Sequence, residues 1–249
     1  IGDSPDFSAV VQELKYYESV FQPSTEVRVV ILETGMTDTE KIGPRGVLDS
    51  LPIRGGEEVL LSIEDNQENP NKLSFKKEKS LYVNRIGGIE PGTQKDLYTM
   101  DFCSREYLAN NQTRVVKRYD GRINSNVVKI LTENGGIQTK KKIDTDVTAV
   151  PYNFIGNDKK PFHVCSWLAS KAIPAMVVDG KSSIGGAAGY FFFETYDGYK
   201  FKAVDKLLEG KPLKRYILTG KPDTPPAGYT GKLISAKIDR YIDLERNLN

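Results

Sequence analysis

Apolar and polar side chains alternate in several short runs within residues 1–103, which is the spacing of β-strands that bury one face. The runs that predict strands are 10–21 (a strand or a short helix), 26–34, 57–64, 73–89 (one or two strands) and 95–103. Glycine, proline and polar residues separate them, and we expect a short helix or turn at 47–53. This arrangement predicts a small antiparallel barrel or sandwich of about five or six strands.

The spacing of apolar residues changes from strand to helix at Ser104. Ser104 is a typical N-cap for a helix over 104–111, and Glu106 suits the positive end of the helix dipole. A second helix is predicted over 124–133, with an apolar face made of Ile123, Val127, Ile130 and Leu131.

A third helix is predicted over 161–174, because Pro161 suits the first turn of a helix and Pro174 stops one. Its apolar stripe consists of Phe162, Cys165, Leu168, Ala169 and Ala172.

Residues 189–201 (GYFFFETYDGYKF) are the most aromatic stretch of the chain and predict a β-hairpin. Asp197-Gly198 suits a tight type I′ turn. The first strand has aromatic residues on both faces and is expected to be covered on both sides. The second strand sets Tyr199, Phe201 and Ala203 against two lysines, so one of its faces is expected to meet water.

The pattern predicts an α+β fold in three parts: a β domain over 1–103, an α+β domain from 104 that carries the aromatic hairpin, and the start of a further part. The tail at 216–249 contains one strand, a Pro/Gly loop and an apolar run. Between the last two parts, 201–210 run from a strand into a short helical turn.

Composition narrows the possibilities without naming a function. A chain of 249 residues favours two domains, and a net charge of +2 gives no electrostatic reason to wrap nucleic acid or to dock on an anionic membrane. No apolar run approaches the ~20 residues of a membrane-spanning helix, so no membrane insertion is expected. Cys103 and Cys165 are predicted to be partly buried thiols in a reducing compartment.

Residues 175–182 (AMVVDGKS) fit a relaxed phosphate-loop pattern that ends in Gly180-Lys181-Ser182. A phosphate loop needs a strand before it and a helix after it, so that backbone amides and the helix dipole hold the phosphates. Here a predicted helix precedes the pattern and a predicted strand follows it. Nucleotide hydrolysis that uses Lys181 is therefore the weakest of the functions considered.

Other candidate groups also have plain structural interpretations. His163 is the single histidine and lies in the first turn of a predicted helix, where packing or solvation is the usual role. Asp144 and Asp146 lack the spacing of a calcium loop and are expected to be turn residues. The basic residues Arg114, Lys117, Arg118, Arg122, Lys140, Lys141 and Lys142 are expected to form a solvated face or an interface. We therefore predict no enzyme activity, no cofactor and no metal.

Four segments, taken in order, resemble the baseplate central hub proteins of contractile-tailed (myovirus-type) phages. They are 13–34, 51–64, 96–131 and 161–208, and they cover most of residues 10–210. The features matched are LPIRGGE (51–57) before an alternating strand, FCSREYL (102–108) where the strand changes to a helix, and WLA (167–169) followed by the aromatic hairpin.

The resemblance implies a structural protein of the virion. Hubs of this family are trimers in which each protomer supplies two tube-like barrels. The resulting pseudo-sixfold ring joins the sixfold tail tube to the trimeric central spike, and related hubs occur in contractile injection systems. For this chain the resemblance implies that 1–103 form the first tube-like β-barrel, 104–212 the inserted α+β module and 213–249 the start of a second β-barrel. The implied partners are two further copies of the chain, the tail-tube protein, the central spike protein and other baseplate proteins. The implied place is the virion tail baseplate, assembled in the host cytoplasm, with DNA passing through without specific binding.

Residues 213–249 are too few for a second barrel at roughly five residues a strand plus turns. We therefore expect either that the natural polypeptide continues or that this is a reduced hub. The strands expected near subunit contacts carry Leu51, Arg54, Val59, Leu61, Ile63, Tyr98, Met100 and Phe102.

A tail-associated receptor- or carbohydrate-binding module is the alternative function. Exposed aromatic rings would supply a stacking platform for a sugar or a receptor. The residues of that platform would be Tyr190, Tyr196, Tyr199 and Trp167.

Overall fold

The computed structural model describes residues 7–33, 53–64, 72–91, 95–178, 181–184, 189–209, 211, 214–219 and 226–233. The chain divides into two compact units, Ile1–Leu207 and Leu208–Asn249, which are described separately. The domain boundaries drawn from the sequence at 103/104 and 212/213 stay predictions.

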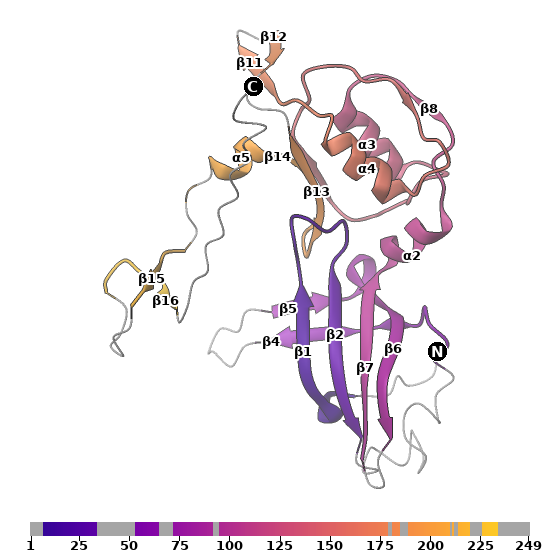
Figure 1. The fold of residues 1–249 in the computed structure, drawn as a ribbon, viewed down its shortest axis with the longest axis vertical. Helices are drawn as coiled ribbons and strands as arrows, with labels where there is room; N and C mark the ends of the chain where they lie inside the picture. The colour runs from indigo at the N-terminus through magenta and orange to yellow at the C-terminus, as the bar shows by residue number, and fades with distance from the viewer. Residues whose placement is uncertain are drawn as a thin grey trace, which may run out of the picture. The chain divides into compact units, whose positions relative to one another are not determined.

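An antiparallel sheet is the largest element of the first unit, and Figure 1 shows its longer strands side by side. Its strand order is β1 (Val11–Tyr17), β2 (Glu26–Glu33), β7 (Asp96–Ser104), β6 (Leu81–Pro91) and β3 (Glu58–Val59). A separate pair consists of β4 (Leu61–Glu64) and β5 (Lys72–Phe75), and short 3₁₀ turns lie at Ser8–Val10 and Lys77–Lys79. The strands predicted at 10–21, 26–34, 73–89 and 95–103 are therefore confirmed.

The single strand predicted over 57–64 is wrong, because the chain changes partner at Leu60. Strand β3 pairs with β6, whereas β4 pairs with β5. The predicted face is nevertheless confirmed, since Val59, Leu61 and Ile63 are half-buried against the core of the sheet. The helix or turn expected at 47–53 lies almost wholly outside the described residues.

The core of this sheet forms where strands β2 and β7 set apolar side chains opposite each other. Val27 faces Phe102, Val29 faces Met100, and Ile31 faces Tyr98, and all six side chains are buried. Cross-strand pairs of this kind stabilise a sheet directly, and burying each side chain contributes about 1.5–3 kcal/mol. In the described residues β1 and β3 are the edges of the sheet, so a closed barrel stays a prediction.

The α+β module gathers three helices and a small sheet around one core, with α4 packed on the sheet and α3 packed on α4. The helices are α2 (Arg105–Gln112), α3 (Ile123–Thr132) and α4 (Pro161–Ala169), and the sheet has the order β13 (Tyr190–Thr195), β14 (Gly198–Ala203), β9 (Ile143–Thr145). A two-stranded ribbon of β8 (Arg118–Tyr119) and β10 (Phe154–Ile155) completes it. The apolar faces predicted for the second and third helices are buried, so those faces are confirmed. The predicted helix end at Pro174 is wrong, because α4 stops at Ala169 and the Ser170 hydroxyl donates to the carbonyl of Trp167.

The aromatic hairpin exists, but its turn lies one residue earlier than predicted. Thr195 pairs with Gly198, so Tyr196 and Asp197 form the turn. Neither has a positive φ, which contradicts the predicted type I′ turn. Gly198 has φ +128° and lies so close to the loop that a Cβ there would be 2.2 Å from the Lys142 carbonyl oxygen. Glycine is needed at 198 for that contact rather than for a type I′ turn.

The remaining elements are short. The hairpin of β11 (Ala175–Val178) and β12 (Lys181–Ile184) precedes the aromatic strands, and α5 (Val204–Leu208) follows them as predicted. In the second unit β15 (Tyr216–Leu218) pairs in parallel with β16 (Gly231–Leu233), so the described residues hold two strands where one was predicted. Together these elements confirm the α+β class.

Candidate functional site

A buried cluster of three charged side chains lies where the large sheet meets the α+β module. Lys141 Nζ lies 2.6 Å from Glu194 Oε1 and 3.0 Å from Glu106 Oε2. The side chains are 0 % exposed at Glu194, 2 % at Glu106 and 7 % at Lys141. Buried charges at this depth need partners, because an unpaired one costs several kcal/mol.

Hydrogen bonds from both parts of the unit complete the cluster. Glu194 Oε2 accepts from the Thr25 amide at 2.9 Å and from the Ser104 hydroxyl at 3.0 Å, so residues at the start of β2 and the end of β7 hold a side chain of β13. Glu106 Oε1 accepts from the Thr139 hydroxyl at 2.7 Å. The cluster therefore ties the sheet, helix α2, the loop before β9 and the aromatic hairpin to one another.

The local sequence explains how each charge reaches this point. Glu194 follows three phenylalanines on a strand covered on both faces, so its side chain cannot avoid the interior. Glu106 is the second residue of α2, which begins directly after the last residue of β7. Ser104 holds the N-cap position, as predicted, but its hydroxyl donates to Glu194 and makes no capping bond. Glu106 lies in the first turn of α2, as predicted, and its side chain is buried.

Burial and the neighbouring charges shift the pKa values of the cluster in opposite directions. Burial raises the pKa of Glu194, and the neighbouring ammonium of Lys141 opposes that rise only in part. Burial by itself lowers the pKa of Lys141, but the charges of Glu194 and Glu106 outweigh it and raise that pKa above the ordinary value. With all three groups ionised, the cluster carries one surplus negative charge.

The tip of the aromatic hairpin makes a second contact, with strand β5 and the 3₁₀ turn that follows it. The Tyr196 hydroxyl donates to the Ser74 carbonyl at 3.2 Å and accepts from the Ser74 amide at 3.1 Å. The Tyr196 ring packs edge-on against Phe75, and Lys79 Nζ lies 3.5 Å from its centroid. Nearer the module, Phe191 meets Phe21 of the loop after β1 edge-on at 5.4 Å.

The hairpin therefore contributes to both hydrophobic cores of the first unit. Tyr190, Phe192, Tyr199 and Phe201 belong to the core of the module, whereas Tyr196 packs against that of the sheet. Combined with the ion cluster, this makes β13 and β14 the connection that fixes the two cores relative to each other.

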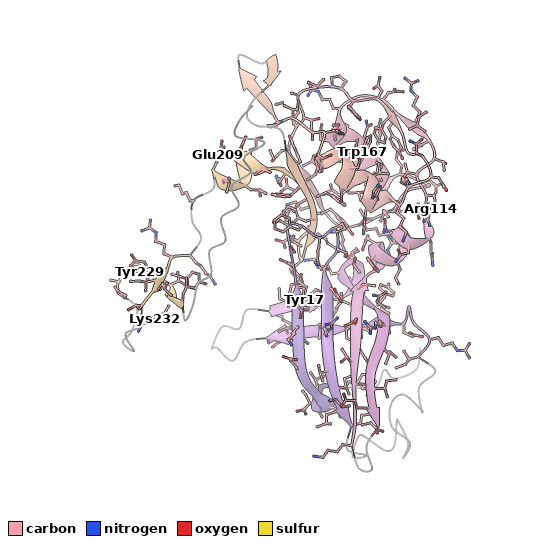
Figure 2. All side chains as sticks on the ribbon, in the orientation of Figure 1. Tyr17, Arg114, Trp167, Glu209, Tyr229 and Lys232 are labelled. Atoms are coloured by element: carbon pink, nitrogen blue, oxygen red, sulfur yellow. The ribbon has the colours of Figure 1, made fainter. Side chains whose placement is uncertain are left out.

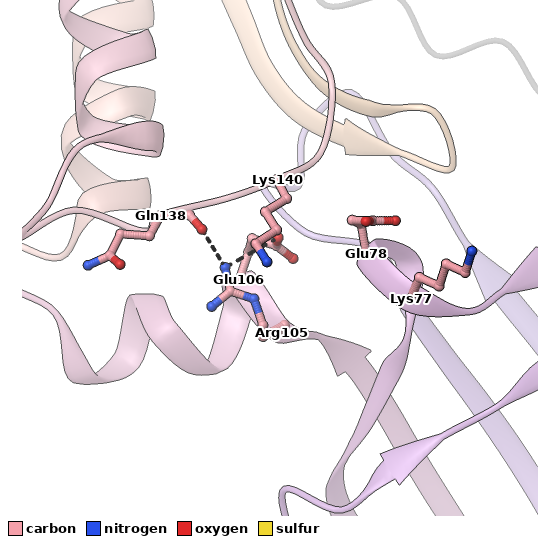
Figure 3. Close-up of a pocket in the computed structure, with 6 residues that line it drawn as sticks. All are labelled: Lys77, Glu78, Arg105, Glu106, Gln138 and Lys140. Carbon is pink, nitrogen blue, oxygen red and sulfur yellow. Dashed lines mark hydrogen bonds and ion pairs between the residues drawn. The ribbon is translucent and has the colours of Figure 1, made fainter.

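A pocket of about 430 Å³ opens next to the cluster, as Figure 3 shows. Arg105 crosses it and donates to the Gln138 carbonyl at 2.8 Å, while its guanidinium lies 3.8 Å from Glu106 Oε1. The lining residues are Lys77, Glu78, Arg105, Glu106, Gln138 and Lys140. Both cationic and carboxylate side chains line it, so the walls favour no ligand of a single sign.

The residues predicted near subunit contacts occupy two different environments. Tyr98, Met100 and Phe102 lie in the core of the sheet, and Val59, Leu61 and Ile63 are half-buried against it. Arg54 is exposed beside Gly55, and Leu51 lies outside the described residues. That these strands lie near subunit contacts stays a prediction.

The phosphate-loop pattern over 175–182 falls on a β-hairpin. Met176 pairs with Ser183 and Val178 pairs with Lys181, so a strand occupies the place where a phosphate loop needs the start of a helix. His163 is exposed on α4, which agrees with a solvated role.

Asp144 and Asp146 are ion-pair partners and not turn residues, so that prediction is wrong. Asp144 lies on β9 and accepts from Lys200 and Lys202 of β14, and Asp146 also accepts from Lys202. No group of three or more potential metal ligands occurs in the part of the chain that the structure describes. Likewise, none of the described helices is both long and apolar enough to span a membrane.

The candidate basic residues differ from one another in burial, and both cysteines are buried. Arg114, Lys117 and Arg118 are exposed, as expected of a solvated face, whereas Lys141 is buried and the prediction for it is wrong. Cys103 and Cys165 are buried free thiols, and burial raises the pKa of Cys103 to about 12 and that of Cys165 further.

The aromatic residues considered as a binding platform do not form one. Tyr190 and Tyr199 are 5 % and 0 % exposed, and the ring of Tyr196 is packed against Phe75 and Lys79. Trp167, labelled on α4 in Figure 2, is 37 % exposed, and its ring packs edge-on against Tyr152 and Phe154. The alternative of a stacking surface is therefore wrong for the residues proposed.

Comparison with solved structures finds similar folds at low sequence identity. A 43 kDa tail protein of prophage MuSo2 from Shewanella oneidensis aligns with 85 % of this chain and 58 % of its own, at 8 % identity and a TM-score of 0.49. An E. coli component of the type VI secretion system, described as similar to the T4 bacteriophage tail proteins gp27 and gp5, aligns with 76 % of this chain and 48 % of its own, at 11 % identity and a TM-score of 0.40. This chain thus spans less than two thirds of the length of either protein. No family model and no curated protein sequence matches it.

Proposed function

We propose that this protein is a structural component of a phage tail baseplate, in which three copies form a central hub between the tail tube and the spike. The observation that carries the proposal is the fixed connection between the sheet and the α+β module. A baseplate subunit transmits load between its neighbours, and the buried ion cluster and the hairpin tip hold two cores in one orientation.

The large sheet also supplies a route to a ring of subunits. Its edges in the described residues, β1 and β3, differ in sequence and length. Edge-to-edge pairing between copies is then head-to-tail, and such contacts close into a ring when the rotation between copies permits it. In the proposed hub, three copies close such a ring around the tail axis.

The ordered resemblance of four segments to hub proteins supports the same function. Three of them fall on the joined parts of the first unit: 13–34 covers β1 and β2, 96–131 covers β7 to most of α3, and 161–208 covers α4 to α5. The proposal also lies in the same class as the two similar structures, whose descriptions name a phage tail and a type VI secretion system. In this role the chain acts as a scaffold without enzyme activity, and DNA passes it without specific binding.

The mass of the purified protein in solution tests this function. Light scattering is expected to give the mass of three chains, and adding the tail-tube or spike protein of the same virion is expected to give a larger complex. A control variant, Glu78→Gln, changes an exposed residue of the 3₁₀ turn and is expected to keep the trimer. A stable monomer that binds neither the tube nor the spike protein would contradict the proposal.

A further inference from the structure

The ion cluster holds one more carboxylate than it holds cations, in a place that water barely reaches. Among the residues that the structure describes, Lys141 is the one ammonium in contact with both Glu106 and Glu194, and the two carboxylates are almost fully buried. Arg105 approaches only the far side of Glu106, at 3.8 Å, and is 44 % exposed. A surplus buried charge is costly, and uptake of one proton removes it.

Glu194 is the carboxylate placed to take that proton. Hydroxyl groups surround its Oε2 atom: Ser104 donates to it at 3.0 Å and Thr25 at 3.4 Å. The buried Tyr199 hydroxyl lies near Ser104 without the geometry of a hydrogen bond. A hydroxyl can donate to a carboxylate or turn and accept from a carboxylic acid, so these neighbours accommodate both forms of Glu194. Glu106, by contrast, still has Lys141 as a partner when Glu194 is neutral.

We propose that the cluster is a proton-linked joint, in which Glu194 binds one proton as the pH falls below neutral and thereby strengthens the attachment of the α+β module to the large sheet. In the protonated state the cluster becomes a neutral set of Lys141, ionised Glu106 and uncharged Glu194. The inference does not depend on the proposed function.

The other groups that face Glu194 act in opposite directions, and burial decides the outcome. Burial raises the pKa of Glu194 first of all, Lys141 and the Thr25 amide lower it, and the charge of Glu106 adds to the rise. When a carboxyl has a higher pKa in the folded state than in the unfolded state, the free energy of unfolding falls as the pH rises from the unfolded pKa to the folded pKa. Over this pH range the folded state binds the proton more tightly than the unfolded state does. Acidification from neutral pH therefore removes this destabilisation. The titratable or charged groups around the cluster are Tyr16 of β1, Cys103 of β7, Arg105 and Glu106 of α2, Lys141 of the loop before β9, and Tyr199 of β14.

The amide of Thr25 reports the protonation of Glu194, because it donates to Glu194 Oε2. Its chemical shift in the full chain is followed by NMR from about pH 8 to about pH 2, a range that extends well to both sides of the ordinary glutamate pKa of about 4.3. We expect a midpoint above that ordinary value. The amide of Gly55, which donates to the exposed Glu57 at 2.9 Å, is an internal control, and its midpoint is expected below the ordinary value.

Two variants extend the test. In Glu106→Gln the surplus charge is gone, so the Thr25 midpoint is expected to move to lower pH. In Glu194→Gln the Thr25 titration is expected to vanish, and the difference in melting temperature between variant and wild type is expected to shrink as the pH falls. A Thr25 midpoint at or below that of ordinary glutamate overturns the proposal, as does a midpoint that Glu106→Gln leaves unchanged. The measurement on wild-type protein decides the question even if one variant fails to fold.

Discussion

Replacing Lys141 with methionine removes the cation of the buried cluster and keeps most of the volume of the side chain. Glu106 and Glu194 then lie in the interior at 2 % and 0 % exposure without the ammonium that contacted both. Removing one partner of a buried ion pair costs about 3–5 kcal/mol, because the charge left behind stays desolvated. For a chain of this size that corresponds to a fall in melting temperature of roughly 6–20 °C.

Urea unfolding at neutral pH measures the loss. The single tryptophan, Trp167, packs against Tyr152 and Phe154 in the module, so its fluorescence reports unfolding of that core. Lys140→Met is the matched control, since Lys140 is the exposed neighbour of Lys141, and it is expected to change stability by no more than about 0.5 kcal/mol. Equal stabilities of the two variants would refute the assignment of Lys141 to a buried joint.

The pH dependence of the same variant has a definite sign. The folded pKa of Lys141 is raised, so its stabilising effect is complete below the ordinary lysine pKa and is lost as the pH rises through the raised value. The gap between wild type and Lys141→Met is therefore expected to be widest near neutral pH. It narrows in strong alkali, where Lys141 loses its charge, and in acid, where Glu194 loses its charge.

Three further predictions test the hairpin and the thiols. Gly198 and Gly189 both have a positive φ, but a Cβ added at 198 would lie 2.2 Å from the Lys142 carbonyl oxygen, whereas a Cβ added at 189 has its nearest contact at 3.6 Å. Thermal melting is therefore expected to show a larger loss of stability for Gly198→Ala than for Gly189→Ala, by about 1–3 kcal/mol. Equal losses would contradict the close approach at 198. Tyr196→Phe leaves the Ser74 amide without its hydroxyl partner and is expected to lower the free energy of unfolding in urea by about 1–3 kcal/mol. Tyr229 is exposed, so Tyr229→Phe is the control and is expected to leave stability unchanged. Cys103 and Cys165 are expected to be inert to a thiol reagent at mildly alkaline pH until urea unfolds the chain, because burial raises the pKa of both thiols. Rapid labelling of the native protein would contradict this, since it would show that a thiol is accessible.

Periodicity alone was enough to find most of the elements. The alternation of Tyr98, Met100 and Phe102 and the helical spacing of Val127, Ile130 and Leu131 describe buried faces that the structure confirms. These patterns succeed because burial of one face follows directly from the geometry of a strand or a helix. The break at Leu60 was missed because the same alternation continues through it, and only the change of partner strand reveals it.

The ion cluster was missed for a different reason. Lys141 stands between two other lysines, and nothing in that run separates the buried one from its exposed neighbours. Glu194 did carry a signal, since a carboxylate on a strand with aromatic residues on both faces requires a buried partner. Which cation supplies it depends on contacts between residues 53 positions apart, and one sequence does not contain that information.

A map of the intact tail particle, determined by electron cryomicroscopy, tests the central claim most directly. The account predicts three copies of this fold around the tail axis, between the last ring of the tube and the spike, with the large sheet and the α+β module in one fixed orientation in every copy. Finding the chain at the periphery of the baseplate, in a number other than three, or absent from the particle would contradict it.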